Sequence, residues 1–201
     1  MNDFTIVDLL RHGEPDGGQK FRGAVDDPLS PRGWEQMQTA VGTYQDWEAI
    51  ISSPLIRCAA FAQTLAQRLD RPLEIAHGFS EIRFGVWEGR SVAEVHDEDP
   101  AALGRFWRDP VAHPIPDGEP VGAFDQRIGV AWDALLERYR GRHVLLVAHG
   151  GVIRMILRRL LDMPIHRIWR MEVPFAAVSR MRVHRDPDAE PHLVFHNGRL
   201  A

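Results

Sequence analysis

The chain has 201 residues, of which 44% are hydrophobic and 26% charged, and its 24 basic and 28 acidic residues give a net charge of −4. This composition is that of a folded globular protein and excludes a collagen-like, coiled-coil or disordered chain. The negative balance argues against nucleic acid or an anionic membrane as partner, because both attract basic proteins. Lys20 is the one lysine and the other 23 basic residues are arginine. Arginine forks suit bidentate binding of anions, but composition alone does not separate that role from a bias in base composition.

Three features set the expected class and compartment. A single cysteine, Cys58, excludes a disulfide framework and a cysteine-based zinc site. Asp3 and Asp8 interrupt the apolar stretch near the N-terminus, unlike a signal peptide, and no apolar run approaches the roughly 18 residues of a membrane span. We therefore expect a cytoplasmic protein, with one domain over residues 1–201 because no linker-like break divides the chain.

Apolar periodicity and helix-start signals predict strands that alternate with helices. The predicted strands are 4–10, 49–52, 73–76, 143–148, 176–184 and 192–196, and the predicted helices cover 31–44, 54–69, 100–108, 121–139 and 150–161. Ser30-Pro31 and Ser53-Pro54 each combine an N-cap serine with proline at the first helical position. Ser91 and Glu94 form a capping-box pattern, and 113–119 is a loop by composition. Such alternation predicts a three-layer α/β/α sandwich with a mainly parallel central sheet.

Polar residues follow three of the predicted strands. Arg11 and His12 come after the first strand, Arg57 follows the strand at 49–52 by one turn of helix, and His149 and Gly150 follow the strand at 143–148. The carboxyl ends of parallel strands meet at one edge of a sheet, where ligands of α/β proteins bind. The glycine-rich start of the helix at Gly150 adds free backbone N–H groups and a positive dipole end, which suit an anion.

This set of groups fits phosphoryl transfer. A phosphate monoester needs its charge neutralised, a nucleophile in line and a proton for the leaving oxygen. Arginine forks bind phosphate oxygens and neutral imidazole is a nucleophile, while nearby arginines disfavour the imidazolium form. The motif context leaves Glu81, Glu14 and Glu88 as candidates for the acid.

Five blocks of the sequence resemble the histidine phosphatase (phosphoglycerate mutase-like) superfamily. They are 10–14 (LRHGE), 27–33 (DPLSPRG) with Gln36, 52–57 (SSPLIR), 81–89 (EIRFGVWEG) and 147–151 (VAHGG), in the order of the family. The resemblance implies a phosphoglycerate mutase-like fold and a phosphomonoesterase without metal or cofactor, in which His12 is phosphorylated. It also implies that Arg11, Arg57 and His149 hold the phosphoryl group. Glu81 would give the leaving group its proton and later activate water.

The chain departs from the family pattern after the first block. Many members have Ser or Thr directly after RHGE and Asn three residues further on, whereas this chain has Pro15 and Gly18. Proline has no hydroxyl and no backbone N–H. We hypothesise that backbone N–H groups of Gly17 and Gly18 replace the lost donors. Arg22 either contacts the charge of the substrate or is a solvated surface arginine.

The substrate stays open at this level. The segment 169–181 (WRMEVPFAAVSRM) resembles the α-ribazole phosphatase branch of the family, which implies α-ribazole 5'-phosphate, a small phosphate monoester. The alternatives are a phosphoglycerate mutase and a phosphate-binding module with little catalysis, for which Pro15 and Gly18 speak. A homodimer stays open as well. His192 and His196 are four residues apart on a predicted strand without a carboxylate partner, so we expect no metal site there.

Overall fold

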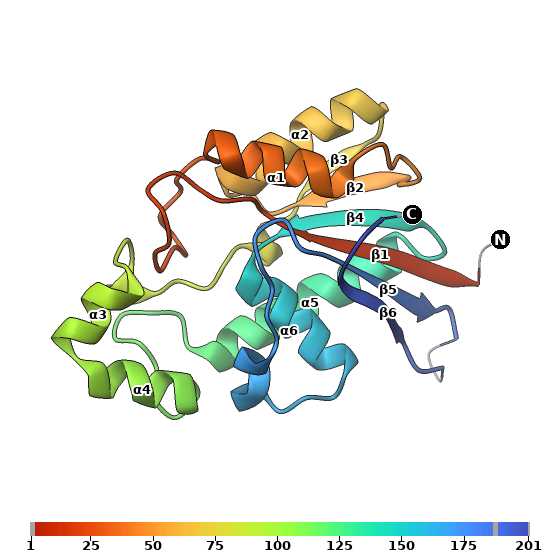
Figure 1. Ribbon diagram of the computed structural model, residues 1–201. Helices are drawn as coiled ribbons and strands as arrows, with labels where there is room; N and C mark the ends of the chain where they lie inside the picture. Colours follow the sequence, from red (N-terminus) through yellow and green to blue (C-terminus); the bar gives the residue numbers. More distant parts are fainter. Residues whose placement is uncertain (1–2, 187–188, 201) are drawn as a thin grey trace.

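A single mixed sheet organises the computed structural model, which describes residues 3–186 and 189–200 (Figure 1). Its strands in the described residues are β1 (Phe4–Arg11), β2 (Ala49–Ser52), β3 (Leu73–Ile75), β4 (His143–Ala148), β5 (Val178–His184) and β6 (His192–Gly198), in the order β3-β2-β4-β1-β5-β6. The pairs β3–β2, β2–β4 and β4–β1 are parallel, and β5 is antiparallel to both β1 and β6. The predicted mainly parallel sheet is therefore confirmed, with antiparallel pairing at one edge.

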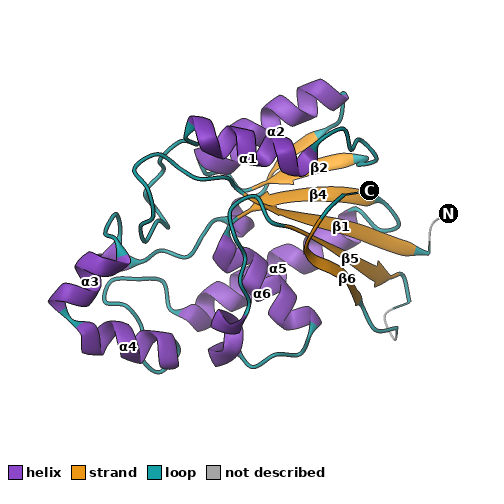
Figure 2. Ribbon diagram, in the orientation of Figure 1, coloured by secondary structure: helices purple, strands orange, loops and turns teal. Residues whose placement is uncertain are grey.

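Helices cover both faces of this sheet, as Figure 2 shows. The longer ones are α1 (Pro31–Val41), α2 (Ile56–Leu69), α5 (Val121–Arg138) and α6 (Gly150–Leu160). Successive strand residues face opposite sides, so Val7 and Leu9 of β1 join the core under α5 and α6, whereas Leu10 joins the core under α1 and α2. The predicted three-layer sandwich is confirmed. Within the described residues, no helix combines the length and the apolar character needed to cross a membrane.

Two short helices, α3 (Val92–Glu98) and α4 (Pro100–Arg108), lie away from the sheet at the left of Figure 1. The predicted capping box is present at the start of α3, where Ser91 Oγ accepts from Glu94 N at 3.1 Å and Glu94 Oε2 accepts from Ser91 N at 2.7 Å. The carboxylate of Asp99 caps α4 by accepting from Ala102 N at 2.8 Å. Three 3₁₀ helices that the sequence did not predict cover His77–Phe79, Gly85–Trp87 and Ile165–Arg170 in the described part of the chain.

The two Ser-Pro signals have different outcomes. Ser30 caps α1 as predicted, accepting from Gly33 N at 3.0 Å. The prediction for Ser53 was wrong, because α2 begins at Ile56 and has no side-chain cap. The hydroxyl of Ser53 instead lies 2.7 Å from Nε2 of His149. The serine that the local sequence assigned to a helix cap therefore contacts His149, a residue from another part of the chain.

Candidate active site

The ends of β1 and β4 bring His12 and His149 side by side. His12 N donates to the carbonyl of Ala148 at 3.0 Å, and the two imidazole rings lie 5.2 Å apart between centroids. Arg57, in the first turn of α2, joins them. All three side chains are buried, with exposed fractions of 5% for His12 and 0% for His149 and Arg57. The edge predicted from the sequence thus holds these residues in one place.

Two glycines fix the backbone that carries His12. A Cβ on Gly13 would lie 2.1 Å from the carbonyl oxygen of Gly33, and a Cβ on Gly33 would lie 2.1 Å from that of Glu14. No side chain fits at these distances, so the loop after β1 packs backbone to backbone against the first turn of α1. This contact explains in physical terms why the blocks RHGE and SPRG both contain glycine.

The contacts of His12 define its protonation. Its Nδ1 lies 2.7 Å from the carbonyl oxygen of Gly13, and a carbonyl accepts only, so Nδ1 carries the proton and Nε2 keeps its lone pair. Burial lowers the pKa of His12 well below its usual value, and the charges of Arg11 and Arg57 act in the same direction. The imidazole is therefore neutral near pH 7, with Nε2 available as a nucleophile.

Arg11 and Arg57 supply positive charge, and the carboxylate of Asp26 lies 3.8 Å from Nη1 of Arg57. Arg57 donates to the carbonyls of Val25 at 2.9 Å and Arg22 at 3.0 Å, and Arg11 donates to that of Val173. In the described residues the buried Nε of each has no acceptor. Burial lowers the pKa of Arg11 to about 10 and that of Arg57 in the same direction. Buried donors are normally paired, so an oxyanion seated between the two arginines would supply the missing acceptors.

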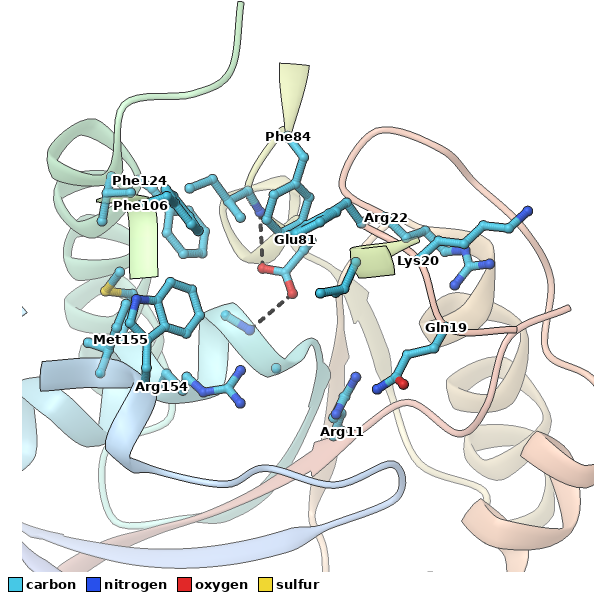
Figure 3. Close-up of a pocket in the computed structure, with 18 of the residues that line it drawn as sticks. Arg11, Gln19, Lys20, Arg22, Glu81, Phe84, Phe106, Phe124, Arg154 and Met155 are labelled. Carbon is cyan, nitrogen blue, oxygen red and sulfur yellow. Dashed lines mark hydrogen bonds between the residues drawn. The ribbon is translucent and has the colours of Figure 1, made fainter. Parts of the chain in front are cut away.

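A cavity of about 360 Å³ opens onto these groups, and Arg11, His12, Glu81, Gly150 and Gly151 form its polar end. Figure 3 shows the carboxylate of Glu81 projecting into the cavity above Arg11. His149 and Arg57 are completely buried and support His12 from the protein side. Of the predicted site residues, Arg11, His12 and Glu81 therefore line the cavity, whereas His149 and Arg57 do not.

Two backbone N–H groups hold the carboxylate of Glu81. Ile82 N donates to Oε1 and Gly151 N to Oε2, each at 3.0 Å, the contacts dashed in Figure 3. A Cβ at position 151 would lie 2.3 Å from Oε1. The second glycine after His149 is thus required for the carboxylate to reach the start of α6.

The other two acid candidates lie elsewhere. The nearest cation to the carboxylate of Glu14 is the exposed Arg32, at 3.7 Å. Glu88 accepts from four backbone N–H groups: Ala24 and Phe84 at 2.8 Å, Gly23 at 3.0 Å and Val25 at 3.3 Å. The carbonyls of the same loop hold Arg57, so Glu88 fixes the loop that positions this arginine. Hydrogen bonds between segments some 60 residues apart leave no local signal, which is why the sequence missed this role.

The loop after His12 differs from its prediction. Arg22 is buried rather than solvated, and its guanidinium donates to Asp27 at 2.7 Å, to the carbonyl of Asp16 at 2.8 Å and to that of Gly18 at 3.0 Å. Gly18 has φ +72° and is exposed. Gln19 lines the cavity instead of Gly18, and Figure 3 shows its amide end toward Arg11. The amide of Gln19 is thus a hydrogen-bond donor at the cavity that the sequence did not indicate.

Arg154 is a further residue that the sequence misplaced. Its position in the last predicted helix predicts that Arg154 lies on a solvated polar face. This prediction was wrong, because Arg154 lines the cavity. Its Nε donates to the carbonyl of Met171 at 2.9 Å, and burial lowers its pKa. By contrast, Arg158 and Arg159 pair with Asp125 of α5 at 2.9 and 3.2 Å.

The histidines of β6 do not form a metal site with other ligands in the described residues. His196 contacts Ser179 Oγ at 2.8 Å and the carbonyl of Glu172 at 2.7 Å. Over residues 3–186 and 189–200, no group of three or more His, Cys, Asp or Glu side chains is arranged to hold a metal ion.

The fold and these residues define a class of protein. The model of the histidine phosphatase superfamily (branch 1) matches residues 7–195. The chain belongs to this superfamily.

Individual relatives match most of this chain at low identity. A bifunctional protein of Mycobacterium tuberculosis is 30% identical over an alignment of 201 positions, which covers 98% of this chain and 55% of the relative. The chain thus spans about half the length of that relative. The adenosylcobalamin/alpha-ribazole phosphatase of Escherichia coli K12 is 29% identical over 182 residues, covering 88% of this chain and 89% of that protein. The solved structure of Bacillus stearothermophilus YhfR has a TM-score of 0.85 at 25% identity and covers 98% of both chains.

Proposed function

We propose that this chain is a phosphomonoesterase that works through a phosphohistidine on His12. The observation that carries the proposal is a neutral buried imidazole with a free Nε2, near two arginines whose buried Nε atoms have no acceptor in the described residues, in a cavity that Glu81 also lines. Membership of the histidine phosphatase superfamily and the phosphatase name of the Escherichia coli relative support it. We propose residues 1–201 as one catalytic domain, because a single sheet, with the loops and helices that follow its strands, positions these side chains.

In the first step Nε2 of His12 attacks phosphorus, and the bond from phosphorus to the ester oxygen breaks. Glu81, protonated, gives its proton to that oxygen, so the alcohol leaves neutral. Arg11 and Arg57 neutralise the charge on the phosphoryl oxygens. Burial lowers the pKa of His149 well below its usual value, so its imidazole is neutral. In this mechanism it donates one hydrogen bond to a phosphoryl oxygen. The N–H of Gly150 at the start of α6 adds a donor and the positive end of the helix dipole.

In the second step water replaces the alcohol. Glu81, now a carboxylate, takes a proton from the water as its oxygen attacks phosphorus, and the bond from phosphorus to Nε2 breaks. Inorganic phosphate leaves, and both His12 and Glu81 return to their starting states. No step requires a metal ion or an organic cofactor.

For the substrate we propose α-ribazole 5'-phosphate. The name of the Escherichia coli relative supports this choice. So does the position of the segment 169–181, whose Trp169 and Phe175 line the same cavity as His12.

The test is release of inorganic phosphate, with EDTA present, from p-nitrophenyl phosphate, α-ribazole 5'-phosphate and 3-phosphoglycerate. We expect turnover by the wild type and a loss of roughly 10³-fold or more in His12→Ala, the scale for removing a nucleophile. His192→Ala, at an exposed position of β6, is the control and keeps full activity. Isomer formed from 3-phosphoglycerate without phosphate release would indicate a mutase, and full activity in His12→Ala would contradict the mechanism.

A further inference from the structure

Beyond the catalytic groups the cavity becomes apolar. We name this part the aromatic chamber, and it is formed by Phe84, Phe106, Trp107, Phe124, Met155 and Trp169. In Figure 3, Phe84, Phe106 and Phe124 gather on the side of Glu81 that is opposite to Arg11. The cavity therefore has a phosphate end and an apolar end, with the proposed proton donor between them.

The rings of the chamber hold one another in place. Trp107 and Trp169 meet edge to face at 4.6 Å between centroids, and Phe106 lies 5.6 Å from Trp169. Phe106 and Phe124 are buried, whereas Phe84, Trp107 and Trp169 stay partly exposed along the cavity. Ring faces that stay in contact with water are stabilised when an apolar surface covers them, and flat rings cover them best.

Arg154 lies at the boundary between the two ends. A Cβ on Gly150 would lie 3.1 Å from Arg154 Nη1, and the Cζ of Arg154 lies 5.6 Å from the centroid of the Trp169 ring. No ion pair within 4 Å engages this guanidinium in the part of the chain that the structure describes. Its free N–H groups suit oxygen atoms of the segment that joins an ester to a ring.

We propose that the alcohol of the substrate carries a flat, uncharged aromatic ring that lies in the aromatic chamber, with Arg154 donating to oxygens between ring and phosphate. This inference rests on the proposed function, since the ring belongs to the leaving group. The chemical class is a phosphate monoester whose alcohol carries an aryl or heteroaryl ring on an oxygen-bearing segment, which includes α-ribazole 5'-phosphate but is wider. A short acidic ester such as 3-phosphoglycerate would leave the rings of the chamber facing water.

A pair of esters that differ only in the ring tests the proposal. Ribose 5-phosphate and benzimidazole riboside 5'-phosphate share the phosphoribosyl group. We expect kcat/KM in the wild type to favour the ring-bearing ester by about tenfold, which is within the range for stacking of one base on an aromatic side chain. Trp107→Leu should lower this preference severalfold, because leucine keeps apolar contact but has no flat face.

The control is Trp34→Leu. Trp34 is half-buried, as Trp107 is, but it packs on Phe61 of α2 at 5.7 Å and does not line the cavity. We expect the preference of Trp34→Leu for the ring-bearing ester to equal that of the wild type. Phe84→Leu is the second chamber variant, should Trp107→Leu fail to fold by circular dichroism.

Calorimetry with the His12→Ala variant separates this inference from the proposed function. There, tighter binding of the ring-bearing ester than of ribose 5-phosphate supports the chamber even when no ester is hydrolysed. Hydrolysis of both esters with no preference for the ring, or a preference unchanged in both chamber variants, would overturn the inference and leave the phosphatase mechanism standing. A preference for 3-phosphoglycerate would overturn it as well.

Discussion

Strand β1 carries two buried polar clusters, at Asp8 and three residues further on at Arg11, that are built in opposite ways. At Asp8 the carboxylate has no exposed surface and accepts from Trp47 Nε1 and Arg180 Nε at 2.7 Å and from His143 Nε2 at 2.9 Å. At Arg11 a buried Nε has no acceptor in the described residues. The first cluster pairs its charges within the protein. The second leaves positive charge and donors for a ligand to complete.

This difference separates stability from function. A buried charge with its partners in place stabilises one fold, whereas removal of a single partner leaves an uncompensated charge in the interior. A site that binds an anion must keep its donors free of permanent acceptors, so it contributes less to stability than its hydrogen-bonding capacity allows. Substitutions in the Asp8 cluster should therefore affect unfolding, and those around Arg11 should affect turnover.

The largest expected effect is that of Asp8→Ala on stability. It leaves Arg180 and Trp47 without their buried acceptor, and we expect a loss of about 3–5 kcal/mol in the free energy of unfolding, measured by urea denaturation. Asp133→Ala, an exposed carboxylate on α5, is the matched control and should change it by less than about 0.5 kcal/mol. A loss below about 1 kcal/mol for Asp8→Ala would remove the contrast between the clusters.

The pKa of Asp8 adds a pH dependence to this cluster. Burial by itself raises that pKa, but hydrogen bonds and charges from Arg180 and His143 outweigh burial and lower it below the usual 3.8. A lowered carboxyl pKa contributes stability that is present above the unfolded value and lost as pH falls through the folded value. Below about pH 4 the difference in stability between the wild type and Asp8→Ala should therefore shrink.

Arg11→Met should show the reverse pattern. Methionine keeps most of the volume and removes a buried charge that has no carboxylate partner, so we expect stability to stay within about 1 kcal/mol of the wild type or to rise. We expect kcat/KM for p-nitrophenyl phosphate to fall about 10²- to 10³-fold, the usual cost of one donor to a developing oxyanion. Paired unfolding and kinetic measurements check both parts. A large loss of stability with normal kcat/KM would assign Arg11 to the structural cluster.

Glu88→Gln is expected to have a smaller effect, which weakens phosphate binding through the loop that holds Arg57. The amide replaces a charged acceptor of four backbone N–H groups, so the loop that holds Arg57 loosens. We expect about a tenfold weaker Kd for inorganic phosphate, measured by calorimetry, with a smaller change in kcat. Glu35→Gln, on the exposed face of α1, should leave the Kd unchanged. An unchanged Kd in Glu88→Gln would show that Arg57 is positioned without this loop.

The smallest expected effect concerns the titration of His12. Its lowered pKa keeps it neutral in the folded chain below pH 6.5, and protonation favours the unfolded chain, so this histidine lowers stability as pH falls below 6.5. NMR titration of the wild type should place its midpoint below 6.5. In Arg11→Met one neighbouring positive charge is gone and the midpoint should rise. A midpoint at or above 6.5 in the wild type would contradict a neutral imidazole held by burial and arginine.

The sequence predicted those parts of the fold that depend on local pattern. The bounds of β2, β4 and α4 agree with the predicted ranges, because apolar runs and capping residues determine them locally. The prediction that Ser53 caps a helix was wrong, because its hydroxyl contacts His149, which lies 96 positions further along the chain. Helical spacing placed Arg154 on a solvated polar face, yet it contacts the carbonyl of Met171 and the ring of Trp169, which belong to a later segment of the chain.

The residues of the site likewise separate into those that local pattern predicts and those that depend on long-range contacts. His12, His149 and Arg57 follow strands, so the parallel sheet alone brings them to one edge. Gln19, Glu88 and the aromatic chamber depend on how long loops and the hairpin of α3 and α4 close over that edge. Those closures arise from contacts between distant segments, which no periodicity in the sequence records.

The central claim is that His12 accepts the phosphoryl group, and trapping that group tests it most directly. In Glu81→Gln the first step proceeds with p-nitrophenyl phosphate, whose leaving group needs no proton, while attack by water lacks its base. We predict that this variant, mixed with p-nitrophenyl phosphate and analysed by mass spectrometry at neutral or alkaline pH, carries one acid-labile phosphoryl group per chain on His12. The account would be contradicted if the wild type hydrolyses p-nitrophenyl phosphate but the Glu81→Gln variant carries no phosphoryl group on His12, or carries it on another residue.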